Sequence, residues 1–251
     1  MEIKVLASGS TGNCYLVRSG QSSLLLDAGI PAKRIREGCD YRLSQISGCL
    51  VTHSHGDHCK AVKDLLAASV PVYMPEKEIA AAGFPAHHRL HPLKRRSVGF
   101  NAASPQTLSY EVFEAGTFAV RPFQTFHDTP EPVGYFIAGG EPGTVENLLY
   151  FTDTYYLQGR FRNLHYIIGE CNYDNETMWE KVESGETPAA RAKRLFSTHM
   201  SLNHFLDFLK CVENPETIRQ IYICHMSDDH GNEANIREAV QRLTGAEVYI
   251  C

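Results

Sequence analysis

The chain has 251 residues, of which 43% are hydrophobic, and it carries a formal net charge of −5. This length is sufficient for one sizeable hydrophobic core. A nucleic-acid-binding domain more often has a basic excess, so the overall charge gives no support to such a partner. No stretch approaches the roughly 18–20 apolar residues that a helix needs to span a bilayer, which argues against a membrane protein.

The cysteines and the start of the chain favour a reducing compartment. Eight cysteines are spread along the sequence without CxxC spacing, so neither a disulfide framework nor a four-cysteine zinc site is expected. The chain starts Met1-Glu-Ile-Lys, a strand-like pattern instead of a basic and then apolar leader. We therefore expect a cytoplasmic protein. No low-complexity linker or repeat divides the sequence, so we expect a single domain over residues 1–251.

Alternating strand-like and helix-like segments predict an α/β protein. Gly-rich turns separate three early strands, and later strands alternate with helical patterns. Strands are expected at residues 3–8, 14–18, 23–27, 48–52, 70–74, 117–126, 134–138, 147–152, 165–170, 220–224 and 247–251. Helices are expected at 57–69, 75–83, 188–196, 199–211 and 233–244, with irregular or hairpin structure at 84–110.

The most informative segment is His53-Ser-His-Gly-Asp-His58, which places three imidazoles and a carboxylate behind an apolar strand. Imidazole nitrogen and carboxylate oxygen are ligands that suit Zn, Mn and Fe. His53 and His55 leave the strand two residues apart, so both rings project to one side. Asp57 and His58 lie where the chain turns into a helix and can face a second point nearby. The segment therefore predicts ligands for two neighbouring metal ions; the alternative is a polar turn with scattered core histidines.

Five segments read as strands that end in a polar residue, often of metal-ligand type. They are Leu50-Val-Thr-His53, Gln124-Thr-Phe-His127, Tyr150-Phe-Thr-Asp153, Phe196-Ser-Thr-His199 and Tyr222-Ile-Cys-His225. Strand ends gathered at one edge of a sheet form a rigid platform for a site built from distant parts of the sequence. Together with Asp27, which ends another strand, they predict a two-metal site.

These residues resemble the metallo-β-lactamase-fold hydrolases. The HxHxDH signature of that superfamily is matched by His53, His55, Asp57 and His58, and its further ligands by His127, Asp153 and His225. Asp27 matches an early Asp that orients the ligand loops by hydrogen bonds. The resemblance implies two divalent ions (Zn, Mn or Fe), one on His53, His55 and His127, the other on Asp57, His58 and His225, with Asp153 bridging. It also implies an α/β fold, a four-layer αββα sandwich, over essentially the whole chain.

A narrower resemblance is to the YycJ/WalJ-type branch, whose characterised activity is 5′-to-3′ DNA exonuclease. It rests on Ala7-Ser-Gly-Ser-Thr-Gly-Asn13, His127-Asp-Thr-Pro-Glu-Pro-Val-Gly-Tyr135, Thr152-Asp-Thr154, Thr198-His-Met-Ser-Leu-Asn203 and Cys224-His-Met-Ser227. The branch typically has Glu-Ser-Asn-His where this chain has Glu170-Cys-Asn-Tyr173. A tyrosine serves less readily than a histidine as a general acid near neutral pH. The resemblance marks His199, Asn203 and Tyr173 as candidate substrate-binding residues.

The implied activity is that of a dinuclear metal-dependent phosphodiesterase, with DNA as the favoured substrate and a metal-bridging hydroxide attacking phosphorus. Two divalent ions less Asp57, Asp153 and the hydroxide leave a charge of about +1, which attracts a phosphodiester anion. Asp57 and Asp153 are catalytic in this interpretation, and His199 is the candidate for phosphate contact or leaving-group protonation. Hydrolysis of a small phosphodiester, a thioester or a lactone remains an alternative, as does a non-catalytic metal-bound module.

The most basic part of the sequence is residues 87–96, with three histidines, three arginines and a lysine. Such a segment can contact a nucleic-acid backbone, where each neutralised phosphate adds salt-dependent affinity. A solvated surface hairpin is the equal alternative.

Overall fold

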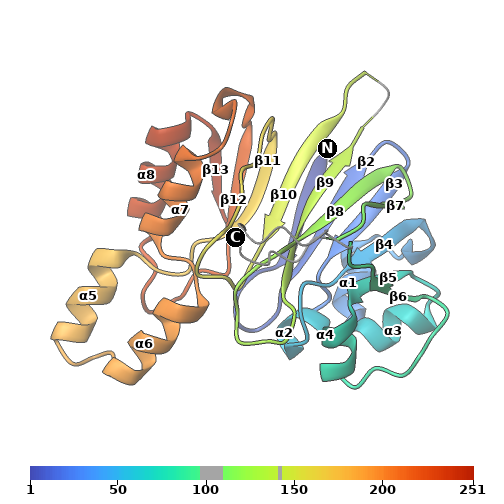
Figure 1. Ribbon diagram of the computed structural model, residues 1–251, viewed down its shortest axis with the longest axis horizontal. Helices are drawn as coiled ribbons and strands as arrows, with labels where there is room; N and C mark the ends of the chain where they lie inside the picture. Colours follow the sequence, from blue (N-terminus) through green and yellow to red (C-terminus); the bar gives the residue numbers. More distant parts are fainter. Residues whose placement is uncertain (97–109, 141–142) are drawn as a thin grey trace. The chain divides into compact units, whose positions relative to one another are not determined.

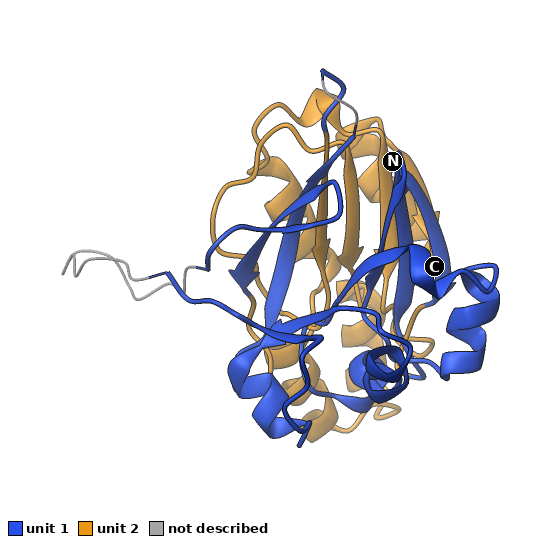
Figure 2. Cartoon of the chain, turned by 90° about the vertical axis from the view of Figure 1, so that its right-hand side faces the viewer, with its two compact units in different colours: residues 1–7, 11–124, 129–145 blue, residues 8–10, 125–128, 146–251 orange. Residues whose placement is uncertain are grey.

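The computed structural model describes residues 1–96, 110–140 and 143–251 (Figure 1). The chain divides into two compact units, coloured separately in Figure 2. Unit 1 comprises residues 1–7, 11–124 and 129–145, and unit 2 comprises residues 8–10, 125–128 and 146–251. A single domain over the whole chain stays a prediction beside this division. Within the segment expected to be irregular, residues 84–110, residues 97–109 lie outside the described residues.

Unit 1 contains a six-stranded sheet covered by helices on one face and by a second set of strands on the other. The sheet order is β1 (Glu2–Ala7), β2 (Cys14–Ser19), β3 (Ser22–Leu26), β4 (Ile46–Leu50), β5 (Val72–Pro75) and β6 (Leu90–Leu93). Strands β1 to β3 are antiparallel, whereas β3 to β6 are parallel. Helices α1 (Ala32–Gly38) and α3 (Val62–Ala67) share one apolar cluster with this sheet, and α4 (Glu76–Ala81) follows β5.

The second set of strands in unit 1 is antiparallel: β7 (Phe113–Ala115), β8 (Phe118–Gln124) and β9 (Val133–Gly139). Two side-chain contacts join it to the six-stranded sheet. The hydroxyl of Tyr135 donates to the Val51 carbonyl at 2.7 Å, and the Phe113 ring stacks on Tyr73 at a centroid distance of 4.4 Å. Unit 1 therefore has a helix–sheet–sheet order of layers.

Unit 2 is built on four parallel strands: β10 (Glu146–Phe151), β11 (Tyr166–Glu170), β12 (Gln220–Cys224) and β13 (Glu247–Ile250). Strands β11 and β12 are almost continuously apolar and buried, as expected of parallel strands covered on both faces. Helix α7 (Leu202–Lys210) packs Phe205 and Phe208 on Phe151 of β10. Helix α8 (Glu233–Thr244) packs beside α7 and β13.

A helical pair, α5 (Asn175–Glu183) and α6 (Ala189–Thr198), completes unit 2. Its small core consists of Tyr173, Met178 and Ala192 with flanking apolar side chains. The α/β class expected from the sequence is confirmed in both units. Among the described residues, no helix has the length and apolar character needed to cross a membrane.

The single helix expected over residues 57–69 is interrupted, because tertiary hydrogen bonds replace helical ones. The Asp57 carbonyl accepts from the Asn13 N–H, and the Ala61 N–H donates to the Ala28 carbonyl, both at 2.8 Å. The helix therefore splits into α2 (Gly56–Cys59) and α3. Gly29 is required at this junction, since a Cβ there would lie 1.6 Å from the Asp57 carbonyl oxygen. The interruption ties the ligand segment to the two early turns of unit 1.

Other differences have local causes. The irregular segment expected at 84–110 contains strand β6, which has a proline at position 92 and lies at the edge of its sheet, where proline is tolerated. Helices α1 and α5 were not among the expected helices. Helix α5 has a recognisable start signal, because the Asp174 carboxylate accepts from the Thr177 N–H at 2.9 Å as an N-cap.

The packing of α7 on the parallel sheet predicts a large effect of truncating Phe205, which is fully buried against Phe151 and Phe208. Phe205→Ala should lower the free energy of unfolding by about 3–5 kcal/mol, because it leaves a cavity in a tightly packed cluster. Chemical denaturation followed by circular dichroism measures this change. Leu243→Ala in α8, at 42% exposure, is the control and should change stability by less than about 0.5 kcal/mol. Equal effects of the two variants would contradict the assigned core.

Candidate metal centre

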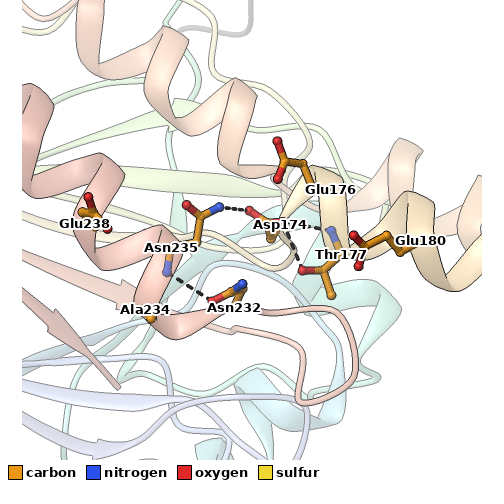
Figure 3. Close-up of a pocket in the computed structure, with 8 residues that line it drawn as sticks. All are labelled: Asp174, Glu176, Thr177, Glu180, Asn232, Ala234, Asn235 and Glu238. Atoms are coloured by element: carbon orange, nitrogen blue, oxygen red, sulfur yellow. Dashed lines mark hydrogen bonds between the residues drawn. The ribbon is translucent and has the colours of Figure 1, made fainter.

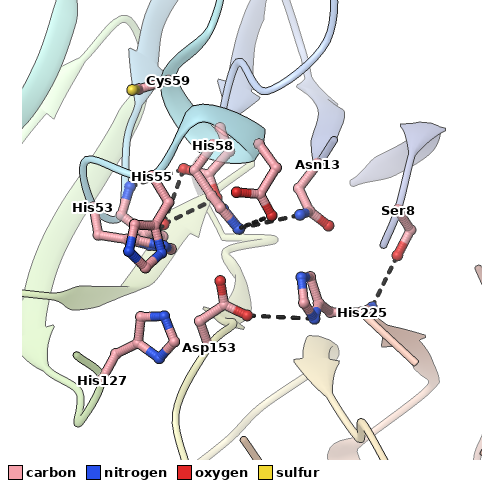
Figure 4. A network of polar contacts seen from close by, with 12 residues as sticks. Ser8, Asn13, His53, His55, His58, Cys59, His127, Asp153 and His225 are labelled. Carbon is pink, nitrogen blue, oxygen red and sulfur yellow. Dashed lines mark hydrogen bonds and ion pairs between the residues drawn. The ribbon is translucent and has the colours of Figure 1, made fainter. Parts of the chain in front are cut away.

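The predicted ligands of unit 1 lie in the loop after β4 and in α2. The facing ring nitrogens of His53 and His55 (Nε2 and Nδ1) are 3.2 Å apart (Figure 4). Two imidazoles on one tetrahedral zinc ion, with Zn–N bonds of about 2.0–2.1 Å, place their nitrogens about 3.3 Å apart. In the second pair, Nε2 of His58 lies 3.4 Å from Oδ2 of Asp57. Both spacings fit shared divalent ions, so the donor set of unit 1 could hold a metal.

Asp27 holds this ligand segment in place. Its fully buried carboxylate contacts Nδ1 of His58 at 2.7 Å and accepts from the Thr52 N–H at 2.8 Å. The Thr52 hydroxyl also bonds to this carboxylate and lies 3.0 Å from Nδ1 of His53. With Nδ1 of His58 donating to Asp27, the lone pair of that ring is on Nε2, which is the side that faces Asp57. The structure therefore places the Asp27 carboxylate against the His58 ring, and its predicted role of orienting a metal ligand stays a prediction.

The predicted ligands of unit 2 meet at the carboxyl ends of its parallel strands. The register pairs Phe151 with Gly169 and Glu170 with Cys224, so the residues that follow β10 and β12 emerge beside the end of β11. Oδ1 of Asp153 lies 3.3 Å from Nδ1 of His225, as Figure 4 shows. Asp153, Glu170, His199 and His225 offer ligand atoms that all lie within 4.8 Å of one another. Unit 2 thus brings together donors that are up to 72 positions apart in the sequence.

His127, also in unit 2, lies beside His199. Its Nδ1 donates to the Thr198 carbonyl at 3.1 Å, which directs the lone pair to Nε2. The His127 and His199 ring centroids are 5.5 Å apart. Burial lowers the pKa of His127, which favours the neutral form that binds metals.

His199 is paired with a carboxylate that the sequence did not mark. Its Nδ1 lies 2.6 Å from Oε1 of Glu170, and Oε2 of Glu170 accepts from the Thr154 N–H at 2.9 Å. Burial alone would lower the pKa of His199, but the charge of Glu170 and the hydrogen bond to it outweigh burial and raise that pKa. The contact with Glu170 therefore stabilises the imidazolium form of His199 relative to a free imidazole.

Two expectations about His199 are corrected. Phe196-Ser-Thr-His199 is not a strand end, because residues 189–198 form α6. His199 does not begin a helix either: it follows α6 with extended backbone angles (φ −132, ψ 153), and α7 begins at Leu202 after the Ser201 N-cap. The Ser201 hydroxyl accepts from the His204 N–H at 3.1 Å, which satisfies the first turn of α7 and leaves His199 in the connection.

Three of the strand-end residues have left-handed backbone conformations. Asp27, Asp153 and His225 have φ values of 56, 47 and 51. For a residue other than glycine this conformation costs about 1–3 kcal/mol and persists only where the surroundings hold it. The Asn172 amide donates to the His225 carbonyl at 2.7 Å, and the His225 N–H donates to the Ser8 hydroxyl at 3.0 Å. These two hydrogen bonds hold the His225 backbone in the left-handed conformation, which a continuing strand would not adopt.

The two other predicted substrate-binding residues lie in different surroundings. Asn203 is exposed in the first turn of α7. Tyr173 is only 3% exposed and packs with Met178 and Ala192, and its hydroxyl is bonded to Ser201. In this position Tyr173 supports the N-terminus of α7, and a substrate contact for it stays a prediction.

Glu170 is the functional candidate that sequence reasoning missed. The available signal was its place at the end of an apolar strand, the same position that singled out Asp153 and His225. Asn13 is part of a turn that the sequence singles out, and its amide lies 3.1 Å from Nε2 of His58. Both residues are buried polar groups beside ligands, and burial is not readable from sequence.

Unit 2 also contains a cavity of about 390 Å³ at the N-termini of α5 and α8 (Figure 3). Its walls carry four carboxylates, those of Asp174, Glu176, Glu180 and Glu238. None of the lining residues is a predicted site residue. A wall with this charge repels a phosphate group, so the cavity is not the substrate site of a phosphodiesterase.

Comparison with known proteins agrees with this chemistry. "Exodeoxyribonuclease YycJ" of Bacillus anthracis is 28% identical over 256 residues, covering 97% of this chain and 89% of that protein. "Exodeoxyribonuclease WalJ" of Streptococcus pneumoniae is 25% identical over 248 residues, covering 93% and 83%. The resemblance to the YycJ/WalJ-type branch is thereby confirmed.

Two solved structures share the fold. The metallo-β-lactamase fold protein YhfI from Bacillus subtilis has a TM-score of 0.65 and 17% identity, covering 99% of this chain and 95% of that one. Human tRNase Z, short form, has a TM-score of 0.64 and 17% identity, covering 100% and 96%. These structures confirm the expected fold type, and the family together with the curated relatives confirms the expected class of metal-dependent hydrolase. The model of the metallo-β-lactamase superfamily matches residues 7–153, more than half of the 251 residues, and the chain belongs to this superfamily.

Proposed function

We propose that this protein is a dinuclear metal-dependent phosphodiesterase that degrades DNA as an exonuclease, in the 5′-to-3′ direction by its resemblance to the YycJ/WalJ-type branch. The observation that carries the proposal is the His199–Glu170 pair, 2.6 Å long, in the same cluster as the ligand-type residues Asp153 and His225. A ligand set with an adjoining imidazole that is hydrogen-bonded to a buried carboxylate suits hydrolysis of an ester whose leaving group needs a proton.

The donor sets of the two units fit two divalent ions. In our proposal one ion is held by His53, His55 and His127, the other by Asp57, His58 and His225, with Asp153 between them. Imidazole and carboxylate ligands suit Zn, Mn or Fe. Bound ions supply a positive field that lowers the pKa of water and polarises a phosphate oxygen. Asp57 and Asp153 then act as ligands that also set the net charge of the centre.

His199 has the role of general acid in this proposal. Cleavage of a phosphodiester releases a sugar alkoxide, a strong base that leaves poorly without a proton. Glu170 accepts from Nδ1 of His199, which fixes the ring and stabilises its protonated form. Cleavage of a thioester releases a thiolate, whose conjugate acid has a pKa of about 8.5. A thioesterase therefore has less need of a general acid such as the His199–Glu170 pair.

DNA is favoured over other phosphodiesters by the relatives. The curated proteins that match nearly the whole chain are named exodeoxyribonucleases, whereas the tRNase Z likeness rests on fold alone. RNA is accordingly the second candidate substrate. Hydrolases of small phosphodiesters and of lactones use the same types of metal ligand, so these substrates are tested alongside DNA and RNA.

The purified protein loaded with Mn²⁺ or Zn²⁺ is expected to shorten end-labelled DNA from one end. Asp57→Ala and His127→Ala should abolish this cleavage, because each removes a ligand of the proposed centre. Gel analysis of 5′- and 3′-labelled single and double strands gives both activity and direction. Fully metal-loaded protein that hydrolyses a lactone or thioester, and leaves DNA and RNA intact, would refute the nuclease proposal.

Asp27→Asn is expected to lower metal affinity by about 10–100-fold, because an amide cannot serve both the His58 ring and the Thr52 N–H as the carboxylate does. Competition with a coloured chelator measures the affinity, and elemental analysis should give two ions per wild-type chain. Asp64→Asn, in α3 and away from the ligands, is the control. Unchanged affinity in Asp27→Asn would remove the orienting role.

His199→Ala is expected to slow DNA cleavage by about 10²–10⁴-fold, the usual contribution of a general acid. On a nitrophenyl ester of thymidine phosphate the loss should be much smaller, because nitrophenolate leaves without protonation. His204→Ala, four residues before Phe208 on exposed α7 surface, is the matched histidine control and should keep full activity. Equal losses on both substrates would show that His199 acts in binding or stability instead.

A further inference from the structure

Two buried carboxylates in unit 1, Glu78 and Glu131, lie outside the proposed ligand set. Their exposures are 0% and 2%. Burying an ionised carboxylate is costly unless hydrogen bonds or a cation compensate it. Both carboxylates are compensated, and the partners form a continuous chain of bonds that ends at the metal-ligand segment.

Glu78, in α4, connects two backbone segments. Its Oε2 accepts from the Ser54 N–H at 2.9 Å, and its Oε1 accepts from the Glu131 N–H at 2.5 Å. Ser54 stands between His53 and His55, whose facing nitrogens are 3.2 Å apart. The peptide that sets the angle between these two rings is therefore held by a side chain 24 positions away.

Glu131 is held in turn by its own side-chain contacts. Oε1 of Glu131 accepts from Nε of Arg95 at 2.6 Å and from the Tyr110 hydroxyl at 2.9 Å. Burial acts to raise the pKa of Glu131, but the bonds to Arg95 and Tyr110 outweigh it and leave that pKa below its usual value. Arg95 belongs to the basic segment of the sequence, and this contact gives it a role within unit 1.

Further bonds join the same two stretches of chain. The Val133 N–H donates to the Thr52 carbonyl at 3.2 Å, and the Tyr135 hydroxyl donates to the Val51 carbonyl at 2.7 Å. Residues 131–135 are thus connected to residues 51–54 by two direct hydrogen bonds and by a third connection through the Glu78 carboxylate. The segment after His127, which the sequence singles out and the proposed chemistry does not use, has a structural partner here.

We propose that Glu78, anchored through Glu131, is a positioning residue that fixes the ring geometry of His53 and His55 for metal binding. The inference rests on the proposed metal centre, and it adds a residue to it that contacts neither metal nor substrate. Groups that orient ligands commonly change metal affinity by about 10–100-fold when they are removed. Glu78 acts on the backbone of the ligand segment, whereas Asp27 acts on a ligand ring.

Glu78→Gln is the direct test. The amide keeps the size of the side chain but turns an NH₂ group toward one of the two N–H donors, so one tie is lost. Chelator competition should show affinity for Zn²⁺ lowered by about 10–100-fold. The visible absorption of the Co²⁺-loaded protein, which reports ligand geometry, should shift. Glu76→Gln, an exposed glutamate in the same helix, is the matched control and should change neither.

Tyr110→Phe is the second variant, for the case that Glu78→Gln does not fold. It removes one bond to Glu131 without changing size, and it should shift the Co²⁺ spectrum in the same direction by a smaller amount. A Glu78→Gln or Tyr110→Phe protein with lowered Tm and wild-type Zn²⁺ affinity and Co²⁺ spectrum would overturn the proposal, because a purely structural carboxylate would behave in this way. These readouts need no substrate, so failure of the DNA assay leaves this test standing.

Discussion

The ligand segment of unit 1 depends on one buried hydrogen bond, from Nδ1 of His58 to the Asp27 carboxylate at 2.7 Å. Asp27 follows β3 directly, and the parallel pairing of β3 with β4 sets it beside the start of the ligand loop. The same carboxylate accepts the Thr52 N–H, so it fixes both a ring and the backbone that leads to the next ligands. To make both contacts Asp27 adopts a left-handed backbone conformation with φ 56°, which is locally unfavourable. A single side chain therefore determines where two turns of the site lie.

Unit 2 uses the same arrangement with different residues. Glu170 ends β11, and its two oxygens hold the His199 ring and the Thr154 N–H next to Asp153. In both units a strand-end carboxylate is fully buried, so its orientation is set by protein hydrogen bonds and not by water. Such preorganised groups need no rearrangement during a reaction, which is the main source of electrostatic stabilisation in enzymes. Parallel strands favour such preorganisation, because their carboxyl ends meet at one edge of the sheet.

Much of this site is predictable from sequence because its ligands are strand-end residues of unusual chemical type. Asp27, Asp153 and His225 follow apolar runs, and the HxHxDH segment places four metal-ligand side chains within six residues. Glu170 was not predicted, since a glutamate that ends a strand looks like any solvated terminus until its burial is known. The break between α2 and α3 was also missed, because helical periodicity cannot show that the Asp57 carbonyl is taken by Asn13. Tertiary hydrogen bonds of this kind leave no local pattern.

Part of the negative charge of the chain is buried near the proposed metal ligands. Five carboxylates near the proposed ligands or among them are almost fully buried: Asp27, Glu78, Glu131, Asp153 and Glu170. Within the described residues the Arg95 guanidinium contacts Glu131, and the His199 ring contacts Glu170. Divalent ions are the natural complement to the remaining negative charge, so metal binding should favour the folded state as well as catalysis. A phosphodiester would then be attracted by the loaded centre and repelled by the empty one. The net charge of −5 therefore does not argue against the proposed nucleic-acid substrate, because the field that would attract a phosphate in this proposal is local and depends on the ions.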